Sequence, residues 1–309
     1  MNKKVYLADL GASGGIHKRW KKSLLPVRSY LFEPDKEAAT ALEAEGDVIV
    51  FPFAIWERDA EDTPFYMARR DCSTSSLLRP NLSLLSRWPN SERFETGEEV
   101  SMRTRTLNSL AEEGAIPALD MLKLDIQGAE LAVLSQATRL LPRVIGLEIE
   151  VGFVEIYQGQ PLFRDIDAFL APHGFELVDL RRVWWQRKRP RYCFQARGQL
   201  AFADALYLRS PEDMAVLAAT DPRLAASAFC IYDCYGYYDL CERLLEYPDL
   251  FEPADIKLFT KYLAVKRRSR IPHIPLERTV EVFCLRLLEL VFQRTPSRND
   301  KIIGNRFFD

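Results

Sequence analysis

The sequence predicts an α/β protein with a doubly wound, largely parallel sheet, followed by a helical extension. Between residues 5 and 208, short apolar runs alternate with helix-like patterns, and several of the runs end in an acid. A glycine-rich turn at 11–15 joins the first apolar run to a helical pattern. After about residue 210, strand patterns give way to helical periodicity. Strands that alternate with helices indicate a parallel sheet covered by helices.

Composition and charge restrict the class of protein. The 309 residues are 48% hydrophobic and 28% charged, which is enough apolar material for a full core. The net charge of -2 counts against nucleic-acid binding by the molecule as a whole. We find no signal peptide and no transmembrane run, so we expect a cytoplasmic protein. The six cysteines form no CxxC pair and are expected to be free thiols.

The first part of the chain predicts strands and helices in alternation. The strands are predicted at 5–10, 29–34 and 47–56, and the helices at 16–25 and 36–45. Gly46 is expected to end the second helix. Residues 57–118 are less regular, with strands predicted at 63–67 and 99–107 and a short helix, capped by Asn108 or Ser109, that ends at Gly114.

The second part continues the alternation and then changes character. Strands are predicted at 119–124, 142–150, 175–180 and 201–208, with helices at 128–141 and 163–172. Residues 181–191 are too few for a crossover helix, so the last two strands should be antiparallel. Later helices are predicted at 212–219, 223–245, 253–266 and 276–292. We therefore divide the chain into a domain at 1–209 and a helical extension at 210–309.

The glycine-rich turn predicts a nucleotide-type cofactor. Its three glycines miss the G-x-G-x-x-G spacing of dinucleotide sites. Asp9 would repel a pyrophosphate, but a carboxylate can pair with the ammonium group of a methionine-derived cofactor. The turn should bring a ligand close to the backbone and direct helix amides toward it. Glu33 ends the second strand, where nucleotide folds place the acid that binds a ribose. S-adenosylmethionine is favoured, with a purely structural turn as the alternative.

Three acids are candidates for the chemistry. Asp125 follows one buried strand and Glu150 ends the next, so both should face the crevice at the carboxyl edge of the sheet. Asp125 is the preferred base by its position, and Glu150 is the second candidate. Glu130, in the helix that follows, could orient Asp125 or cap the loop. Asp125, Glu148 and Glu150 do not form a recognised ligand spacing, so no metal is predicted.

Two further segments leave alternatives open. Six basic residues surround a Trp-Trp pair at 181–191, a composition that can bind single-stranded nucleic acid, nucleotide-sugars or anionic lipid headgroups. A solvated hairpin with cation–π contacts explains the same pattern. The polar loop at 72–77 can either line the crevice with hydroxyls and amides or lie in solvent.

Several motifs together resemble the FkbM family of S-adenosylmethionine-dependent methyltransferases. They are Asp-Leu-Gly-Ala at 9–12 with Gly15, Phe-Glu-Pro at 32–34, Leu-Lys-Leu-Asp-Ile-Gln-Gly-Ala-Glu at 122–130 and Leu-Glu-Ile-Glu at 147–150. Residues 159–163 and 173–177 continue the likeness. The resemblance covers about residues 5–209 and is most specific at 123–130.

The resemblance implies a seven-stranded class I methyltransferase fold, which is Rossmann-like, and O-methyl transfer to a sugar, glycan or other hydroxylated small molecule. It implies these contacts to the cofactor: Asp9, Gly11, Ala12 and Gly15 for the methionine part, Glu33 for the ribose, and Asp125 beside the sulfonium and the acceptor. Ser13, in the same turn, is a further candidate for cofactor binding. Ser13 and Gly14 depart from the asparagine–aliphatic pair common in the family. An RNA-binding protein or RNA methyltransferase, and a non-catalytic scaffold with this fold, are the alternatives.

Overall fold

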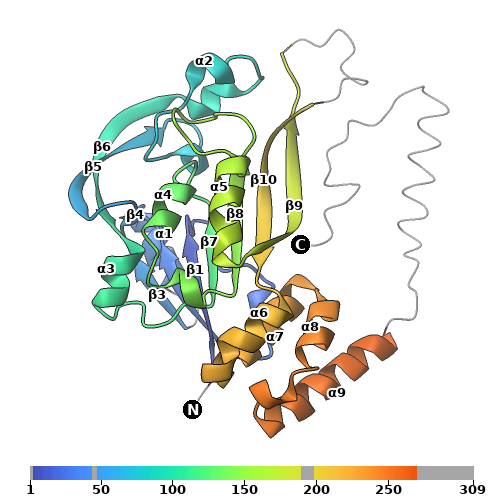
Figure 1. Ribbon diagram of the computed structural model, residues 1–309. Helices are drawn as coiled ribbons and strands as arrows, with labels where there is room; N and C mark the ends of the chain where they lie inside the picture. Colours follow the sequence, from blue (N-terminus) through green and yellow to red (C-terminus); the bar gives the residue numbers. More distant parts are fainter. Residues whose placement is uncertain (1–2, 44–46, 189–197, 270–309) are drawn as a thin grey trace, which may run out of the picture.

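A seven-stranded sheet forms the centre of the computed structural model, which describes residues 3–43, 47–188 and 198–269 (Figure 1). The strands lie in the order β3-β2-β1-β7-β8-β10-β9. Their bounds are β1 (Val5–Leu10), β2 (Val27–Phe32), β3 (Val48–Phe51), β7 (Met121–Leu124), β8 (Gly146–Gly152), β9 (Glu176–Trp185) and β10 (Gln199–Leu208). The first five pair in parallel, whereas β10 is antiparallel to both β8 and β9. The predicted parallel sheet with an antiparallel last strand is confirmed.

Helices cover both faces of this sheet. On one face, Leu124 of β7 and Ile149 of β8 share a core with residues of α3 (Leu107–Glu112), α4 (Glu130–Ser135) and α5 (Phe163–Leu170). On the other face, Leu31 packs against Leu42 of α1 (Lys36–Leu42). Successive side chains of a strand point to opposite faces, so each buried strand supplies both cores. The fold is therefore doubly wound, as predicted.

The helices after residue 210 complete the second face of the sheet. They are α6 (Pro211–Leu217), α7 (Pro222–Tyr235), α8 (Tyr238–Leu244) and α9 (Pro253–Ser269), and Figure 1 shows them grouped below the sheet. Phe229 of α7 and Phe259 of α9 stack with their ring centroids 4.0 Å apart. Both belong to one buried cluster with Leu7 of β1 and Leu206 of β10. The extension and the sheet thus share a continuous apolar core.

The helix predicted at 16–25, directly after the glycine turn, is wrong. That stretch contains only the short 3₁₀ helix η1 (Trp20–Lys22). Trp20 is buried and meets Tyr235 of α7 edge-on, with the ring centroids 5.9 Å apart. Because α7 covers the sheet face on which a longer helix would pack, a single turn is all that remains.

A second sheet, which the sequence did not predict as a separate unit, has the strand order β4-β6-β5. Its strands are β4 (Ala54–Ile55), β5 (Ala60–Ala68) and β6 (Thr96–Arg105). The strand predicted at 47–56 is divided at Pro52, which has no N–H to donate, so β3 ends in the large sheet and β4 joins the small one. Between β5 and β6 lie η2 (Cys72–Thr74), α2 (Leu82–Leu85) and η3 (Ser91–Phe94).

Local chemistry explains most of the remaining differences from the prediction. The helix predicted at 223–245 is broken at Gly236, which adopts φ 84° and separates α7 from α8. The helix predicted at 128–141 ends at Ser135, and Thr106 caps α3 in place of Asn108 or Ser109. Four short 3₁₀ helices complete the described elements: η4 (Leu141–Arg143), η5 (Ala171–His173), η6 (Ala218–Thr220) and η7 (Pro248–Leu250).

Two predictions concern the end of the chain and the membrane. Gly46 and the helix predicted at 276–292 lie outside the described residues. Within the described part of the chain, the helices are all too short or too polar to cross a bilayer.

A buried ion pair joins the extension to the sheet. Asp120, directly before β7, is fully buried, and its carboxylate accepts from Arg223 Nη1 of α7 at 2.7 Å. The Ser227 hydroxyl and the Tyr6 amide also donate to this carboxylate, each at 3.0 Å. These contacts satisfy an acid that would otherwise be costly to bury.

We predict that Arg223→Met lowers the free energy of unfolding by about 3 kcal/mol, because it leaves the buried Asp120 carboxylate without its cation. Combining it with Asp120→Asn should recover part of the loss. Arg243→Met is the control, since its solvent-exposed guanidinium pairs with Glu212 and should contribute little to stability. Urea unfolding measures all four proteins. Equal losses for the Arg223 and Arg243 variants would contradict the role of the buried pair.

Candidate functional site

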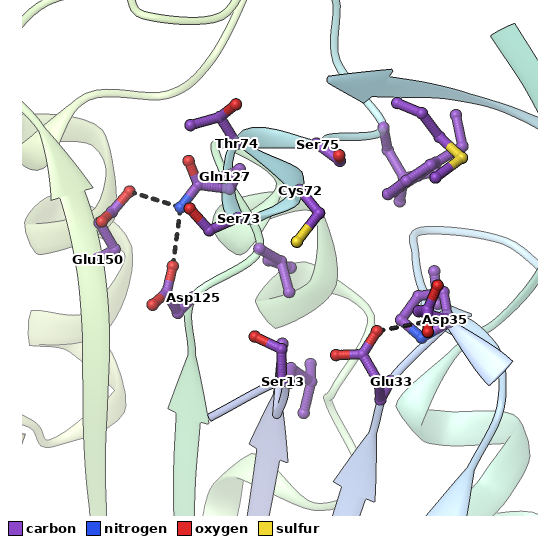
Figure 2. A pocket seen from close by; sticks show the side chains of 18 of the residues that line it. Ser13, Glu33, Asp35, Cys72, Ser73, Thr74, Ser75, Asp125, Gln127 and Glu150 are labelled. Carbon is purple, nitrogen blue, oxygen red and sulfur yellow. Dashed lines mark hydrogen bonds between the residues drawn. The ribbon is translucent and has the colours of Figure 1, made fainter. Parts of the chain in front are cut away.

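A cavity of about 810 Å³ lies at the carboxyl edge of the large sheet (Figure 2). The ends of β1, β2, β7 and β8 contribute to it because the carboxyl ends of parallel strands share one edge. The small sheet supplies Phe65 and Met67 to the wall, and β9 and β10 supply Trp185 and Phe202. The cavity is therefore bounded by both sheets.

Five of the residues predicted from the sequence line this cavity: Gly11, Ser13, Glu33, Asp125 and Glu150. The four other predicted residues do not line the cavity, although each is close in sequence to a residue that does: Asp9, Ala12, Gly15 and Glu130. Figure 2 shows Glu33 at one end of the cavity and the two remaining acids at the other. The site thus has two chemically distinct ends.

The turn after β1 needs glycine at its first position. Gly11 has φ +88°, and a Cβ atom there would lie 2.2 Å from the backbone oxygen of Asp125. The amides of Gly11 and Ala12 both donate to the Phe32 carbonyl, at 3.1 and 3.2 Å. The expectation that helix amides face a ligand here is therefore wrong for these two groups. The turn instead lets the ends of β1, β2 and β7 approach closely.

Glu33 marks one end of the cavity. Its side chain is 7% exposed, and Oε1 accepts from the Asp35 amide at 2.9 Å. Among the described residues, the second carboxylate oxygen has no hydrogen-bond partner. Burial raises the pKa of this carboxyl. Pro34, Ala54 and Ile55 are apolar lining residues of the same cavity. A buried acid beside an apolar slot can accept hydrogen bonds from a ribose diol while an adenine packs on the walls.

Asp9 is partnered within the protein. Asp9 is 4% exposed, and its carboxylate accepts from Lys123 Nζ of the neighbouring strand at 2.9 Å. Burial raises the pKa of Asp9, and the Lys123 cation opposes this effect. Asp9 is therefore not a lining residue of the cavity, and it neutralises the partly buried Lys123.

A single amide joins the two acids at the other end. Gln127 Nε2 donates to Asp125 Oδ1 at 2.9 Å and to Glu150 Oε1 at 3.2 Å (Figure 2). Its Oε1 accepts from the Tyr157 hydroxyl at 2.7 Å. Gln127 adopts φ 58°, a conformation that is unfavourable for a residue with a side chain, and the Ser76 hydroxyl holds its carbonyl at 2.7 Å. The network fixes the separation of the two carboxylates.

The polar loop at 72–77 faces the cavity, as one of its two interpretations predicted. Cys72, Ser73, Thr74, Ser75 and Leu77 are among the lining residues. The Tyr157 hydroxyl lies 2.9 Å from the Thr74 carbonyl oxygen, which connects the loop to Gln127. Neither Gln127 nor Tyr157 was predicted as a site residue. The position of Gln127, within the most specific motif of the sequence, was the available signal for the first of them.

Burial makes Glu150 a stronger base than an ordinary glutamate. Desolvation, followed by repulsion from Asp125, raises its pKa well above the usual value. Asp204 faces Glu150 across the β8–β10 pair and forms an ion pair with Arg181 at 2.9 Å. Burial raises the pKa of Asp204 to about 6. The Glu150 carboxylate therefore has a higher affinity for a proton than an ordinary glutamate.

Glu130 holds the loop that carries Gln127. Its side chain is 3% exposed, and Oε1 accepts from the amides of Ile126 and Gly128 at 3.0 and 3.2 Å. Burial raises its pKa to about 7. These contacts match the capping role that the sequence offered as one alternative for this residue.

A mixed sheet whose last strand runs antiparallel between two others, with a glycine turn leaving its first strand, is the fold of the class I methyltransferases. A family profile described as the methyltransferase FkbM domain matches residues 13–177, which is more than half of the chain. The chain belongs to this family. It is an S-adenosylmethionine-dependent methyltransferase, and the predicted family, fold and cofactor are confirmed.

Known proteins give more distant matches. The 2-O-methyltransferase NoeI of Sinorhizobium fredii (strain NBRC 101917 / NGR234) is 28% identical over 184 residues, which is 56% of this chain and 72% of NoeI. A Synechocystis PCC 6803 magnesium protoporphyrin IX methyltransferase has a TM-score of 0.32 at 10% identity, with 67% of this chain and 70% of that one covered. A Pyrococcus horikoshii protein assigned as an RNA methyltransferase has a TM-score of 0.30 at 14% identity, with 66% and 74% covered. At these TM-scores, no conclusion rests on the two structures.

We predict that Gly11→Ala prevents cofactor binding and lowers the melting temperature, because the new Cβ would clash with the Asp125 carbonyl. Gly14→Ala in the same turn is the control for stability, since a Cβ there meets nothing within 4 Å. Thermal melts with and without S-adenosylhomocysteine measure both effects. Equal melting temperatures for the two variants would contradict the proposed contact.

Glu130 variants separate a structural from a chemical role. Glu130→Ala removes the acceptor of two buried amides and should lower the free energy of unfolding by about 2 kcal/mol. Glu130→Gln keeps an acceptor oxygen. The pKa of about 7 in the folded state lies above the unfolded value, so the wild type should lose stability as pH rises between these two values, and the Gln variant should not. Chemical unfolding on either side of this window measures the difference. A Gln variant with the pH dependence of the wild type would count against this assignment.

Proposed function

We propose that the protein transfers a methyl group to a hydroxyl oxygen of a sugar, glycan or similar hydroxylated small molecule. The observation that carries the proposal is the pair Asp125 and Glu150, held together by Gln127 at the end of the cavity opposite Glu33. An alcohol becomes a good nucleophile only as its proton is removed, so an O-methyltransferase benefits from a base at this point. The name of the relative NoeI, a 2-O-methyltransferase, supports the same reaction.

The lining residues fit S-adenosylmethionine. We assign Glu33 to the ribose hydroxyls, the walls at Pro34 and Ile55 to the adenine, and Gly11 and Ser13 to the methionine part. Gly11 lines the cavity, and its lack of a side chain lets the turn pass against the backbone of Asp125. Ala12, Gly15 and the Asp9–Lys123 pair support the turn from behind. When bound, the cofactor supplies a methyl group activated by a positively charged sulfur.

We assign the proton transfer to Glu150 and the positioning of the hydroxyl to Asp125. The raised pKa of Glu150 gives its carboxylate a high affinity for the departing proton. Asp125 lies next to the glycine turn, where the cofactor and the acceptor would meet. Gln127 donates one hydrogen bond to each carboxylate and holds both in position. Its amide is neutral and does not take up the proton itself. Glu130 acts through the loop and not on the substrate.

We further interpret residues 1–209 as the methyltransferase domain and 210–309 as an extension, whose described residues pack against the domain. The described cysteines are free thiols, which supports a cytoplasmic site of action. RNA as the acceptor is the alternative, and it is included in the experiment below.

Glu150→Gln should lower kcat by about 10²- to 10⁴-fold, because the variant cannot accept the proton. In the wild type, activity should fall as pH decreases through the raised pKa of Glu150, since the base must be ionised. The variant should lack this acidic limb. Transfer of labelled methyl groups to a panel of saccharides, followed over pH, measures both effects.

The same assay identifies the acceptor atom. A methyl ether withstands mild alkali, whereas a methyl ester is hydrolysed. Label that is released by alkali, or that is recovered on nitrogen, would exclude O-methylation of a hydroxyl. Failure of S-adenosylhomocysteine to raise the melting temperature would instead favour a non-catalytic scaffold.

A further inference from the structure

Among the described residues that line the cavity, one has a positively charged side chain. The acidic lining residues are Glu33, Asp35, Glu37, Asp125 and Glu150, and the single basic one is Arg93. The acids suit a cofactor that carries a sulfonium and an ammonium group. Arg93 has the opposite charge, so its presence requires another explanation.

Arg93 lies against an aromatic cluster. Its guanidinium carbon is 4.8 Å from the ring centroid of Phe94 and 5.5 Å from that of Trp185. Trp185 also meets Phe202 edge-on at 5.9 Å, and these three rings line the cavity with Arg93. Cation–π contacts hold a guanidinium in place and leave its N–H groups available to a ligand.

The backbone of Arg93 is tied to the pair of acids. The Thr74 hydroxyl donates to the Arg93 carbonyl at 2.8 Å. The Thr74 carbonyl lies 2.9 Å from the Tyr157 hydroxyl, which also contacts Gln127. Through this chain of contacts, Arg93 keeps a fixed position relative to Asp125 and Glu150. A ligand that contacts Arg93 can therefore place another of its groups at the base.

Within the part of the chain that the structure describes, Arg93 forms no ion pair with a carboxylate. By contrast, Arg181 forms an ion pair with Asp204, and Arg223 forms one with Asp120. A guanidinium that faces a cavity without a carboxylate partner is suited to bind a carboxylate or phosphate through two parallel hydrogen bonds.

We propose that the acceptor is a saccharide carrying an anionic group, a carboxylate or a phosphate, which pairs with Arg93 while the sugar ring packs on Trp185 and Phe94. This inference rests on the proposed O-methyltransferase function and adds the class of acceptor to it. The apolar face of a pyranose ring matches the aromatic wall, and the hydroxyl to be methylated then faces Glu150. The anionic group must lie at Arg93, because the acids elsewhere in the cavity would repel it.

The experiment compares matched probes on the full-length protein saturated with S-adenosylhomocysteine. The probes are glucose with glucuronate, galactose with galacturonate, and glucose with glucose 1-phosphate. We expect at least one anionic probe to bind about 10- to 100-fold more tightly than its neutral match by calorimetry, as charged hydrogen bonds provide. Arg93→Gln should abolish this preference, and Arg93→Lys should keep part of it.

Two controls make the result specific. Arg139→Gln removes one exposed positive charge that pairs with Glu112 on the surface, and it should leave the preference unchanged. The affinity for S-adenosylhomocysteine should be the same in Arg93→Gln as in the wild type. If that affinity falls instead, Arg93 holds the carboxylate of the cofactor and the proposal is wrong.

Other outcomes would also contradict the inference that the acceptor is an anionic saccharide. Equal binding of neutral and anionic sugars, with methyl transfer to the neutral ones, would overturn this inference and leave the proposed function intact. Binding and methylation of a short single-stranded RNA, dependent on Arg93 and absent for every saccharide, would overturn both. If no anionic probe binds more tightly than its neutral match, the inference is wrong.

Discussion

The close contact between the Gly11 turn and the backbone of Asp125 determines the geometry of the cavity. A side chain at position 11 would clash with the Asp125 carbonyl, so the ends of β1 and β7 can lie this close together only if residue 11 is glycine. The same turn donates two amides to Phe32, which ties the end of β2 to this point. Glu33 follows Phe32 and Gln127 lies two residues after Asp125. Both ends of the cavity therefore depend on one backbone contact.

The side-chain amide of Gln127 stabilises the two carboxylates at one end of the cavity, Asp125 and Glu150. Two carboxylates that share one end of a partly buried cavity repel each other. Gln127 donates one hydrogen bond to each acid, while its oxygen accepts from Tyr157. A neutral donor can satisfy both acids without forming the ion pair that a lysine would form, and an ion pair would lower the basicity of Glu150. The strained backbone at Gln127 keeps the amide between them.

The sequence predicted those parts of the site that come from the central strands. Buried parallel strands are continuous apolar runs, so the acids that end them, such as Glu33 and Asp125, can be recognised from their position. Tyr157 and Arg93 could not be found in this way, because irregular segments bring them to the cavity through tertiary packing. Trp185 belongs to the 181–191 segment, whose composition suggested binding but not its place beside this cavity. For the same reason, periodicity alone predicted a helix at 16–25, although α7 already covers that face.

The extension influences the site through the second face of the sheet. The Tyr235 hydroxyl of α7 donates to Glu148 Oε2 at 2.5 Å, and Arg19 pairs with the same carboxylate at 3.2 Å. Arg19 belongs to the segment after the glycine turn, and Glu148 lies on β8 two positions before Glu150, on the same face. A helix from the extension thus contacts both the segment after the glycine turn and the strand that carries the candidate base. The proposed division at residue 209 marks a change of composition, although the described helices after it share an apolar core with the sheet.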